Sequence, residues 1–182
     1  MSIIVRDTTC ADQATLIAFL RDLQDAERVL CASRRPGHEV DRSCYDALLN
    51  DGAHILLAEE DGQAVGFVSG RVKVANDELQ VEAWQTHGHI SDLYVVPAYR
   101  GRGVAQRLLR AMADRLQGEG ACRLSIGALS ANKAAVKAYE RFGFQPFQMR
   151  LDMELVLQPC FTGGSSAPVA LASALLVASS PA

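Results

Sequence analysis

Hydrophobic side chains recur along the first half of the chain with the spacing of alternating strands and helices. A β-branched run opens the chain, and apolar residues at helical spacing follow the pair Thr8-Thr9, which can cap a helix. Asp61-Gly62 predicts a hairpin, because this dipeptide favours the tight turn between two antiparallel strands. The expected elements are a strand at 3–5, a helix carrying Leu16, Ile17, Leu20 and Leu23, a helix at 40–49, and strands at 54–59 and 64–74.

The second half of the chain has the pattern of strand–helix–strand units. A strand over 89–96 ends at Pro97, and the helix after it carries an apolar stripe of Val104, Leu108, Leu109, Met112 and Leu116. The remaining expected elements are a strand at 122–126, a helix capped by Asn132 that stops at Gly143, and a last strand at 147–157 in which Phe147, Met149, Leu151, Met153 and Leu155 share one face. Early hairpins followed by such units indicate an α/β (α+β) fold, with a mixed sheet flanked by helices.

Composition narrows the class of protein. The 182 residues are 49% hydrophobic and 21% charged, which is typical of one globular domain, here expected over 1–157 with a Gly/Ser/Ala-rich tail over 158–182. A net charge of -3 and 6% aromatic residues disfavour nucleic acid as a partner. The N-terminus does not resemble a signal peptide, and no apolar stretch is long enough for a membrane span. We therefore expect a cytoplasmic protein with no membrane partner.

The five cysteines give no sign of a metal or disulfide framework. They are odd in number, widely spaced and lack a CxxC pair. We expect them to be reduced and the protein to hold no metal.

The segment between the strand at 89–96 and the next helix carries the clearest chemistry. Arg100-Gly101-Arg102-Gly103 leads into a helix start, where unpaired backbone N–H groups and the positive end of the helix dipole attract anions. Glycines let an anion approach the backbone, so the loop predicts a diphosphate cradle. It is neither GxGxxG nor a P-loop, which makes NAD and ATP poor fits. Taken alone, the loop is equally consistent with a glycine turn carrying two solvated arginines.

The same loop, Arg100-Gly101-Arg102-Gly103-Val104-Ala105, resembles the R/Q-x-x-G-x-G/A motif of the GNAT superfamily of acyl-CoA-dependent N-acyltransferases. Asp92-Leu93-Tyr94-Val95 resembles the strand that enters this loop in the family. Asn132 and Ala135, followed by Tyr139 through Phe144, are similar to the family's N-x-x-A-x-x-x-Y-x-x-x-G-F segment. The resemblance covers residues 3 to 157.

The resemblance implies a V-splayed sheet that holds acetyl-CoA or CoA as cosubstrate between its two central parallel strands. It assigns the pantetheine arm to the backbone of Leu93, Tyr94 and Val95. It assigns the pyrophosphate to the N–H groups of Arg100, Gly101, Arg102, Gly103, Val104 and Ala105. It also places Asn132 at the pantetheine arm, although this residue is equally well explained as a helix N-cap.

The implied reaction is direct attack of an amine on the thioester, which needs a proton acceptor and a proton donor. By resemblance, Tyr139 is the donor to the thiolate, and the alternative is a core tyrosine beside Phe142. Asp92 is the first choice of base, with Glu82, His87, His89 or water as rivals and a solvated or structural carboxylate as the alternative. Because side chains alternate along a strand, His89 and Asp92 are expected on opposite faces unless a bulge intervenes.

The acceptor is left open by the sequence. Asp77, Glu78, Glu82 and Trp84 lie in the segment 76–88, and acidic residues beside an aromatic ring would suit a small cationic amine. A solvated polar loop is the alternative. The family also contains protein N-terminal and lysine acetyltransferases, so a peptide acceptor stays open, as do a non-catalytic acyl-CoA sensor and a plain interaction module. The apolar stretch 169–177 is a candidate contact of a homodimer.

Overall fold

The computed structural model describes residues 2–74 and 85–153 of the chain. The chain divides into two units, Met1–Pro146 and Phe147–Ala182, and every helix and strand of the described residues lies in the first. In chain order these are β1 (Ile3–Asp7), α1 (Gln13–Arg28), α2 (Arg42–Asn50), β2 (His54–Glu60), β3 (Gln63–Val74), β4 (Thr86–Val95), α4 (Val104–Gly118), β5 (Leu124–Ile126) and α5 (Lys133–Phe142). Short 3-10 turns lie at Cys10–Asp12, Gly37–Glu39 and Pro97–Tyr99.

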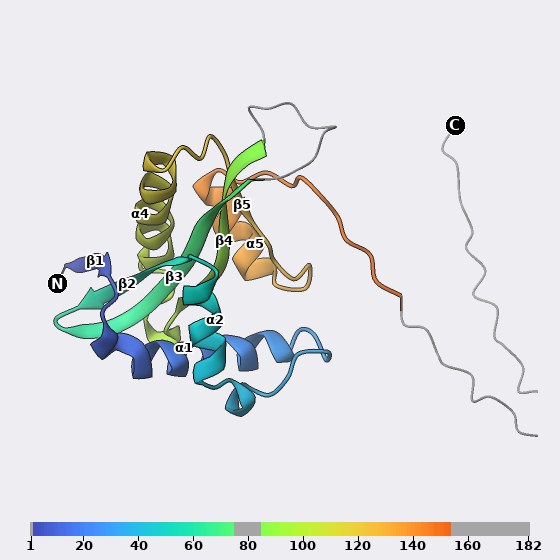
Figure 1. The fold of residues 1–182 in the computed structure, drawn as a ribbon. Coiled ribbons are helices and arrows are strands. Elements are labelled where there is room, and N and C mark those ends of the chain that lie inside the picture. Colours follow the sequence, from blue (N-terminus) through green and yellow to red (C-terminus); the bar gives the residue numbers. More distant parts are fainter. Residues whose placement is uncertain (1, 75–84, 154–182) are drawn as a thin grey trace, which may run out of the picture. The chain divides into compact units, whose positions relative to one another are not determined.

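The strands form one five-stranded sheet in the order β1-β2-β3-β4-β5. Strands β1 to β4 alternate in direction, so that neighbours among them are antiparallel, and β5 pairs with β4 in parallel. Helix α4 covers one face of this sheet, and α1 and α2 cover the other (Figure 1). The expected mixed sheet flanked by helices is therefore confirmed.

Each face of the sheet packs against its own hydrophobic core. The predicted stripe of α4 lies in the first core, where Leu108, Leu109, Met112 and Leu116 are fully buried. On the other face, Phe19 of α1 stacks on Phe67 of β3 and lies 5.4 Å from the Tyr94 ring of β4. Packing against the two cores determines on which face of the sheet each strand residue lies, and this includes the polar residues of β4.

Turns and caps form where the sequence predicts them. Asp61 and Gly62 both adopt positive φ angles, 52° and 79°, as the tight hairpin between β2 and β3 requires. The Asn132 side chain accepts a hydrogen bond from Ala135 N–H at the start of α5. Gly143, with φ of 120°, follows the end of the same helix. Thr9 pairs with Asp12 and begins a 3-10 turn, so α1 starts at Gln13.

The predicted last strand is wrong over the residues that the structure describes. Residues 147–153 have no strand structure, and residues 154–157 lie outside the described part of the chain. The alternating apolar residues Phe147, Met149, Leu151 and Met153 are 76–85% exposed. Alternation predicts a strand only where one face is buried, and these four side chains are exposed.

Metal ligands, cysteines and apolar helices can be located over the described residues only. No group of three or more histidine, cysteine or acidic residues in that part of the chain is arranged to hold a metal ion. Cys10, Cys31 and Cys44 are free thiols, Cys122 Sγ donates a 3.2 Å hydrogen bond to Thr86 O, and Cys160 lies outside the described residues. None of the described helices combines the length and apolar character needed to cross a bilayer.

Candidate functional site

The sheet opens between its two parallel strands. Pairing of β4 with β5 covers Gly88 to Ile90 on one strand and Leu124 to Ile126 on the other. Strand β4 continues to Val95, so its last five residues have no strand partner on that side in the described chain. Backbone N–H and C=O groups left unpaired in this way are available to an amide-containing ligand.

A small pocket of about 80 Å³ lies at this opening. Its walls come from α1, from β4 after the last β5 pair, from the segment after β5, and from α5. The lining residues are Leu23, Glu27, Ser91, Asp92, Leu93, Ile126, Gly127, Ala128, Leu129, Asn132, Ala135 and Tyr139. The fold thus brings together four of the residues singled out in the sequence: Asp92, Leu93, Asn132 and Tyr139.

Asp92 is a partly buried carboxylate held from the neighbouring strand. Ser69 lies directly opposite it on β3, and the Ser69 hydroxyl donates a 2.6 Å hydrogen bond to Asp92 Oδ2. Burial raises the pKa of the Asp92 carboxyl above its ordinary value, while the Ser69 hydrogen bond and the charge of Arg34 oppose that shift. A carboxylate whose pKa is raised becomes a stronger proton acceptor once it is ionised.

Tyr139 lines the same pocket from α5. Burial raises the pKa of Tyr139 to about 12, and the negative charges of Glu27 and Asp92 add to the shift. The ring packs edge-on against Phe144 at 6.1 Å. The Tyr139 ring therefore also belongs to the apolar packing around α5, as the alternative interpretation expected.

The side chains of Tyr94 and Val95, the last two residues of β4, pack into the cores and leave only their backbone for this opening. The Tyr94 ring packs against Phe19 in the core beneath α1, and its hydroxyl donates a 3.1 Å hydrogen bond to Asp22. Val95 is buried in the other core. Among the β4 residues, Asp92 is the ionisable side chain that lines the pocket, beside Ser91 and with Leu93 as an apolar wall.

The loop predicted to be a cradle joins β4 to α4. Gly101 and Gly103 have φ angles of 76° and 81°, and no heavy atom lies within 4 Å of where a Cβ would stand on either. The first helical hydrogen bond is donated by Arg107 N–H to Gly103 O, so the preceding N–H groups of α4 have no acceptor within the helix. Open space in front of unpaired N–H groups at a helix N-terminus fits a diphosphate.

Both arginine side chains of this loop are engaged within the protein. Arg100 Nε donates a 3.0 Å hydrogen bond to Val95 O, and its guanidinium lies 5.9 Å from the Tyr94 ring centroid. Arg102 pairs at 2.8 Å with Glu60, which is only 5% exposed, and lies over the Tyr99 ring. Their clearest roles are to shape the loop, while the backbone presents the donors.

A bulge in β4 overturns the expected alternation around Asp92. Ser69 pairs with Asp92, but the next β3 residue, Gly70, pairs with Ile90, so Ser91 is the extra residue. Ile90 therefore packs into the α4 core, and His89 turns to the face that carries Asp92. The stated exception to the alternation therefore applies: a bulge intervenes, and His89 and Asp92 face the same way.

The rival bases are placed differently. His89 Nδ1 lies 3.0 Å from Ser125 Oγ on β5, and burial lowers the pKa of His89. His87 lies further along the same strand, opposite Lys73. Glu82, like the other acidic residues and Trp84 of the segment expected to attract a cationic amine, lies outside the described residues.

Two residues of the site were missed in the sequence. Glu27 lines the pocket from the last turn of α1 and pairs with Arg34 at 2.8 Å. Ser69 reaches Asp92 only through the register of β3 and β4. Glu27 lies on the polar side of the α1 helix, and a polar residue there does not by itself indicate a site. The Ser69 contact depends on which residue of β4 forms the bulge.

Comparison with known proteins identifies the family. Residues 17–144 match the model of the acetyltransferase (GNAT) family. A Bacillus subtilis (strain 168) protein, provisionally named a ribosomal protein bS18-alanine N-acetyltransferase, is 26% identical over 131 residues, which are 72% of this chain and 80% of that protein. Thialysine N-epsilon-acetyltransferase of Mus musculus is 32% identical over 153 residues, covering 77% of this chain and 81% of the relative.

Solved structures agree in fold. A structure described as a predicted acetyltransferase with acetyl-CoA from Clostridium acetobutylicum aligns with a TM-score of 0.63 at 18% identity, covering 84% of this chain and 96% of that one. At that identity the likeness concerns the fold alone. In this chain, the sheet of that fold opens between β4 and β5. The family match covers β2 to β5, the loop before α4, and α5, and on this basis the chain belongs to the acetyltransferase (GNAT) family.

Proposed function

We propose that the protein transfers an acetyl group from acetyl-CoA to a primary amine by direct attack within a ternary complex. One observation carries the proposal: a proton acceptor, Asp92, and a proton donor, Tyr139, line one pocket at the opening of the sheet. The names of the two relatives, an alanine N-acetyltransferase and a thialysine N-epsilon-acetyltransferase, support transfer to an amine.

The cradle and the strand opening suit the two ends of acetyl-CoA. The N–H groups at the start of α4, with the backbone of the loop 100–105, would hold the pyrophosphate. The backbone of 93–95 and the Asn132 side chain would meet the pantetheine arm. Asn132 already accepts the Ala135 N–H through Oδ1, so its amide NH₂ is the part that remains for a ligand. Acetyl-CoA supplies an activated acyl group on a thiolate leaving group.

Asp92 takes the first proton. An amine reaches the site mostly as an ammonium, and only the neutral form has the lone pair that attacks a carbonyl carbon. The ionised Asp92 carboxylate accepts one ammonium proton, and its raised pKa makes it a better acceptor than an exposed aspartate. Ser69 fixes the carboxylate by its hydrogen bond.

Tyr139 acts on the leaving group. When the tetrahedral adduct collapses, the C–S bond breaks and the electron pair goes to sulfur, which the phenol protonates. The second nitrogen proton is lost as the amide forms, and it restores the phenol through solvent. With a pKa of about 12, Tyr139 stays protonated at neutral pH and is available as a donor throughout.

Thiol release from acetyl-CoA with a panel of amines tests this proposal. The panel includes diamines, aminoglycosides, ω-amino acids and peptides with free N-termini, and the acetylated product is identified by mass. Amine-dependent thiol release is the expected result. CoA binding with no turnover on any amine would instead indicate a non-catalytic sensor, and an unchanged melting temperature with CoA would indicate an interaction module.

A further inference from the structure

Polar residues continue along the Asp92 face of the sheet, beyond the cover of α1. Arg71 and Lys73 of β3 lie directly opposite His89 and His87 of β4. Val72 packs against the α4 core, and a Cβ on Gly88 would meet Leu116 and Leu124. The residues between them, including all four basic ones, therefore face away from α4, as Asp92 does.

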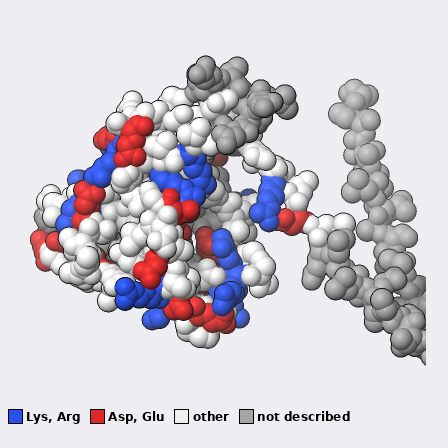
Figure 2. Space-filling view, in the orientation of Figure 1, with Lys and Arg blue, Asp and Glu red and all other residues white. Residues whose placement is uncertain are grey.

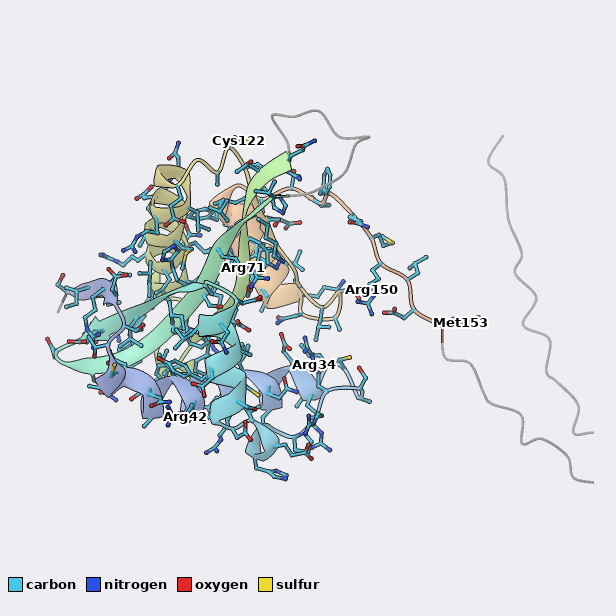
Figure 3. The ribbon with its side chains drawn as sticks, viewed as in Figure 1. Arg34, Arg42, Arg71, Cys122, Arg150 and Met153 are labelled. Atoms are coloured by element: carbon cyan, nitrogen blue, oxygen red, sulfur yellow. The ribbon has the colours of Figure 1, made fainter. Side chains whose placement is uncertain are left out.

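These residues form an ordered series along one face. The pair Phe67–Tyr94 lies beneath α1, Ser69–Asp92 follows it, and then come Arg71–His89 and Lys73–His87. Two residues along a strand span about 7 Å, so along β3 the basic pairs lie roughly 7 Å and 14 Å from the Ser69–Asp92 pair. We call Arg71, Lys73, His87 and His89 the basic ladder. Figure 2 shows Lys and Arg side chains gathered over this part of β3 and β4, and Figure 3 labels Arg71 among them.

Among the described residues, the two cationic side chains of the ladder, Arg71 and Lys73, have one carboxylate partner between them. Arg71 pairs with Asp51, the residue that ends α2. No carboxylate in the described chain pairs with Lys73, and the pKa of Lys73 is lowered by burial and by the charge of Arg71. His89 contacts Ser125 Oγ, a neutral group. Arg71 and Lys73 lie two residues apart on one face of β3, where their positive charges repel each other, and an anion between them would reduce that repulsion.

We propose that the basic ladder binds an anionic group of the acceptor, so that the preferred substrate is an amine that also carries a carboxylate or a phosphate. This inference rests on the proposed function. The amine would lie at Asp92, and the anion one to two ladder steps away, about 7–14 Å along the strand. The acceptor is then an amine separated from its acid group by a chain, rather than a polycation.

The test uses pairs of acceptors with the same amine. 6-Aminohexanoate is compared with hexylamine, and 8-aminooctanoate is compared with octylamine. A further comparison with 6-aminohexyl phosphate shows whether the site prefers a carboxylate or a phosphate. We expect at least a tenfold higher kcat/KM for one of the acidic compounds than for its alkylamine. Equal kcat/KM values across each pair would overturn the proposal while leaving acetyl transfer intact.

Lys73→Gln is the diagnostic variant. It should lower kcat/KM for the preferred acid by about tenfold, equivalent to about 1.4 kcal/mol, and leave hexylamine unchanged. Because the substitution removes a like-charge contact, the melting temperature should stay the same or rise. Lys137→Gln, at an exposed position on α5, is the matched control and should change neither value. A Lys73→Gln enzyme that retains its preference for the acid would overturn the assignment.

A binding measurement keeps the two proposals apart. The imidazole NMR signals of His87 and His89, assigned from His→Gln variants, are followed in the presence of CoA while 6-aminohexanoate or hexylamine is added. If no amine is acetylated, the proposed function fails. This titration then decides on its own whether the basic ladder binds an anionic group. Shifts with the carboxylate and not with hexylamine support an anion site, and equal or absent shifts overturn it.

Discussion

Ser69 Oγ donates a 2.6 Å hydrogen bond to Asp92 Oδ2 from the directly opposite position on the neighbouring strand. The bond stabilises the ionised carboxylate, and it works against the burial that raises the pKa of Asp92. Burial and the hydrogen bond together determine the pKa of Asp92, and so the pH above which Asp92 is ionised and can act as a base. The same hydrogen bond fixes the direction in which the carboxylate faces the pocket.

Ser69→Ala should therefore move the pH dependence of acetyl transfer. Removing the hydroxyl removes an influence that lowers the pKa, so the pKa of Asp92 should rise further. A base works only when it is ionised, so the acidic limb of the kcat/KM profile should shift to higher pH, while the rate at high pH changes little. A limb that stays in place would remove Asp92 as the titrating base. Ser43→Ala, which removes a hydroxyl hydrogen-bonded to Asp41 at the start of α2, outside the pocket residues, is the matched control.

Tyr139→Phe tests the proton donor. The substitution keeps the ring and its packing against Phe144, so the melting temperature and acetyl-CoA affinity should change little. The value of kcat should fall by roughly 10²–10⁴ if the phenol protonates the leaving sulfur. Tyr45→Phe removes a phenol from α2, outside the pocket residues, and serves as the control. Near-normal kcat in Tyr139→Phe, under conditions where chemistry limits the rate, would assign the proton to water.

Local signals in the sequence predict most of the fold. The Asp61-Gly62 turn, the Asn132 cap and the buried stripe of α4 each depend on residues within a few positions of one another. Such features need only backbone preference and periodicity, and they place every described strand and helix in the right order. The cradle belongs to this class, because a strand, a glycine loop and a helix start are contiguous.

The parts that could not be predicted depend on register. A bulge at Ser91 reverses the side of the sheet on which His89 lies, and nothing in the local pattern marks it. Ser69 and Arg71 acquire their roles from the residues opposite them on β4. The register that pairs them cannot be predicted from the sequence between the two strands. The alternation at 147–153 shows the opposite failure: the local pattern is clear, but a strand needs a partner.

Gly103→Glu tests the cradle. A carboxylate there would occupy the open space before α4 and repel a diphosphate, so acetyl-CoA affinity should fall by more than tenfold, or more than about 1.4 kcal/mol. Because Gly103 has a positive φ, the substitution also adds backbone strain of about 1–2 kcal/mol. Gly120→Glu controls for this, since Gly120 also has a positive φ and open space but lies past the other end of α4. Equal affinity in both variants would overturn the assigned pyrophosphate site.

Glu60→Gln tests how the cradle is held. Glu60 is nearly buried at the end of β2 and fixes Arg102, whose guanidinium lies over the Tyr99 ring on the same loop. The amide keeps the shape and one acceptor but loses the charge, which leaves Arg102 weakly anchored. Since the arginine side chain is 45% exposed, water offsets part of the loss, and we expect a cost of about 1 kcal/mol, or roughly 2–4 °C in melting temperature.

A looser loop presents its N–H groups less often in the binding geometry. The KM for acetyl-CoA should therefore rise several-fold in Glu60→Gln while kcat is retained, since neither Asp92 nor Tyr139 contacts this pair in the described chain. Glu59→Gln, one residue earlier on β2, breaks a different ion pair, with Arg6, and is the matched control. If Glu60→Gln lowers the melting temperature as much as predicted but leaves the KM for acetyl-CoA unchanged, the ion pair stabilises the fold and does not shape the cradle.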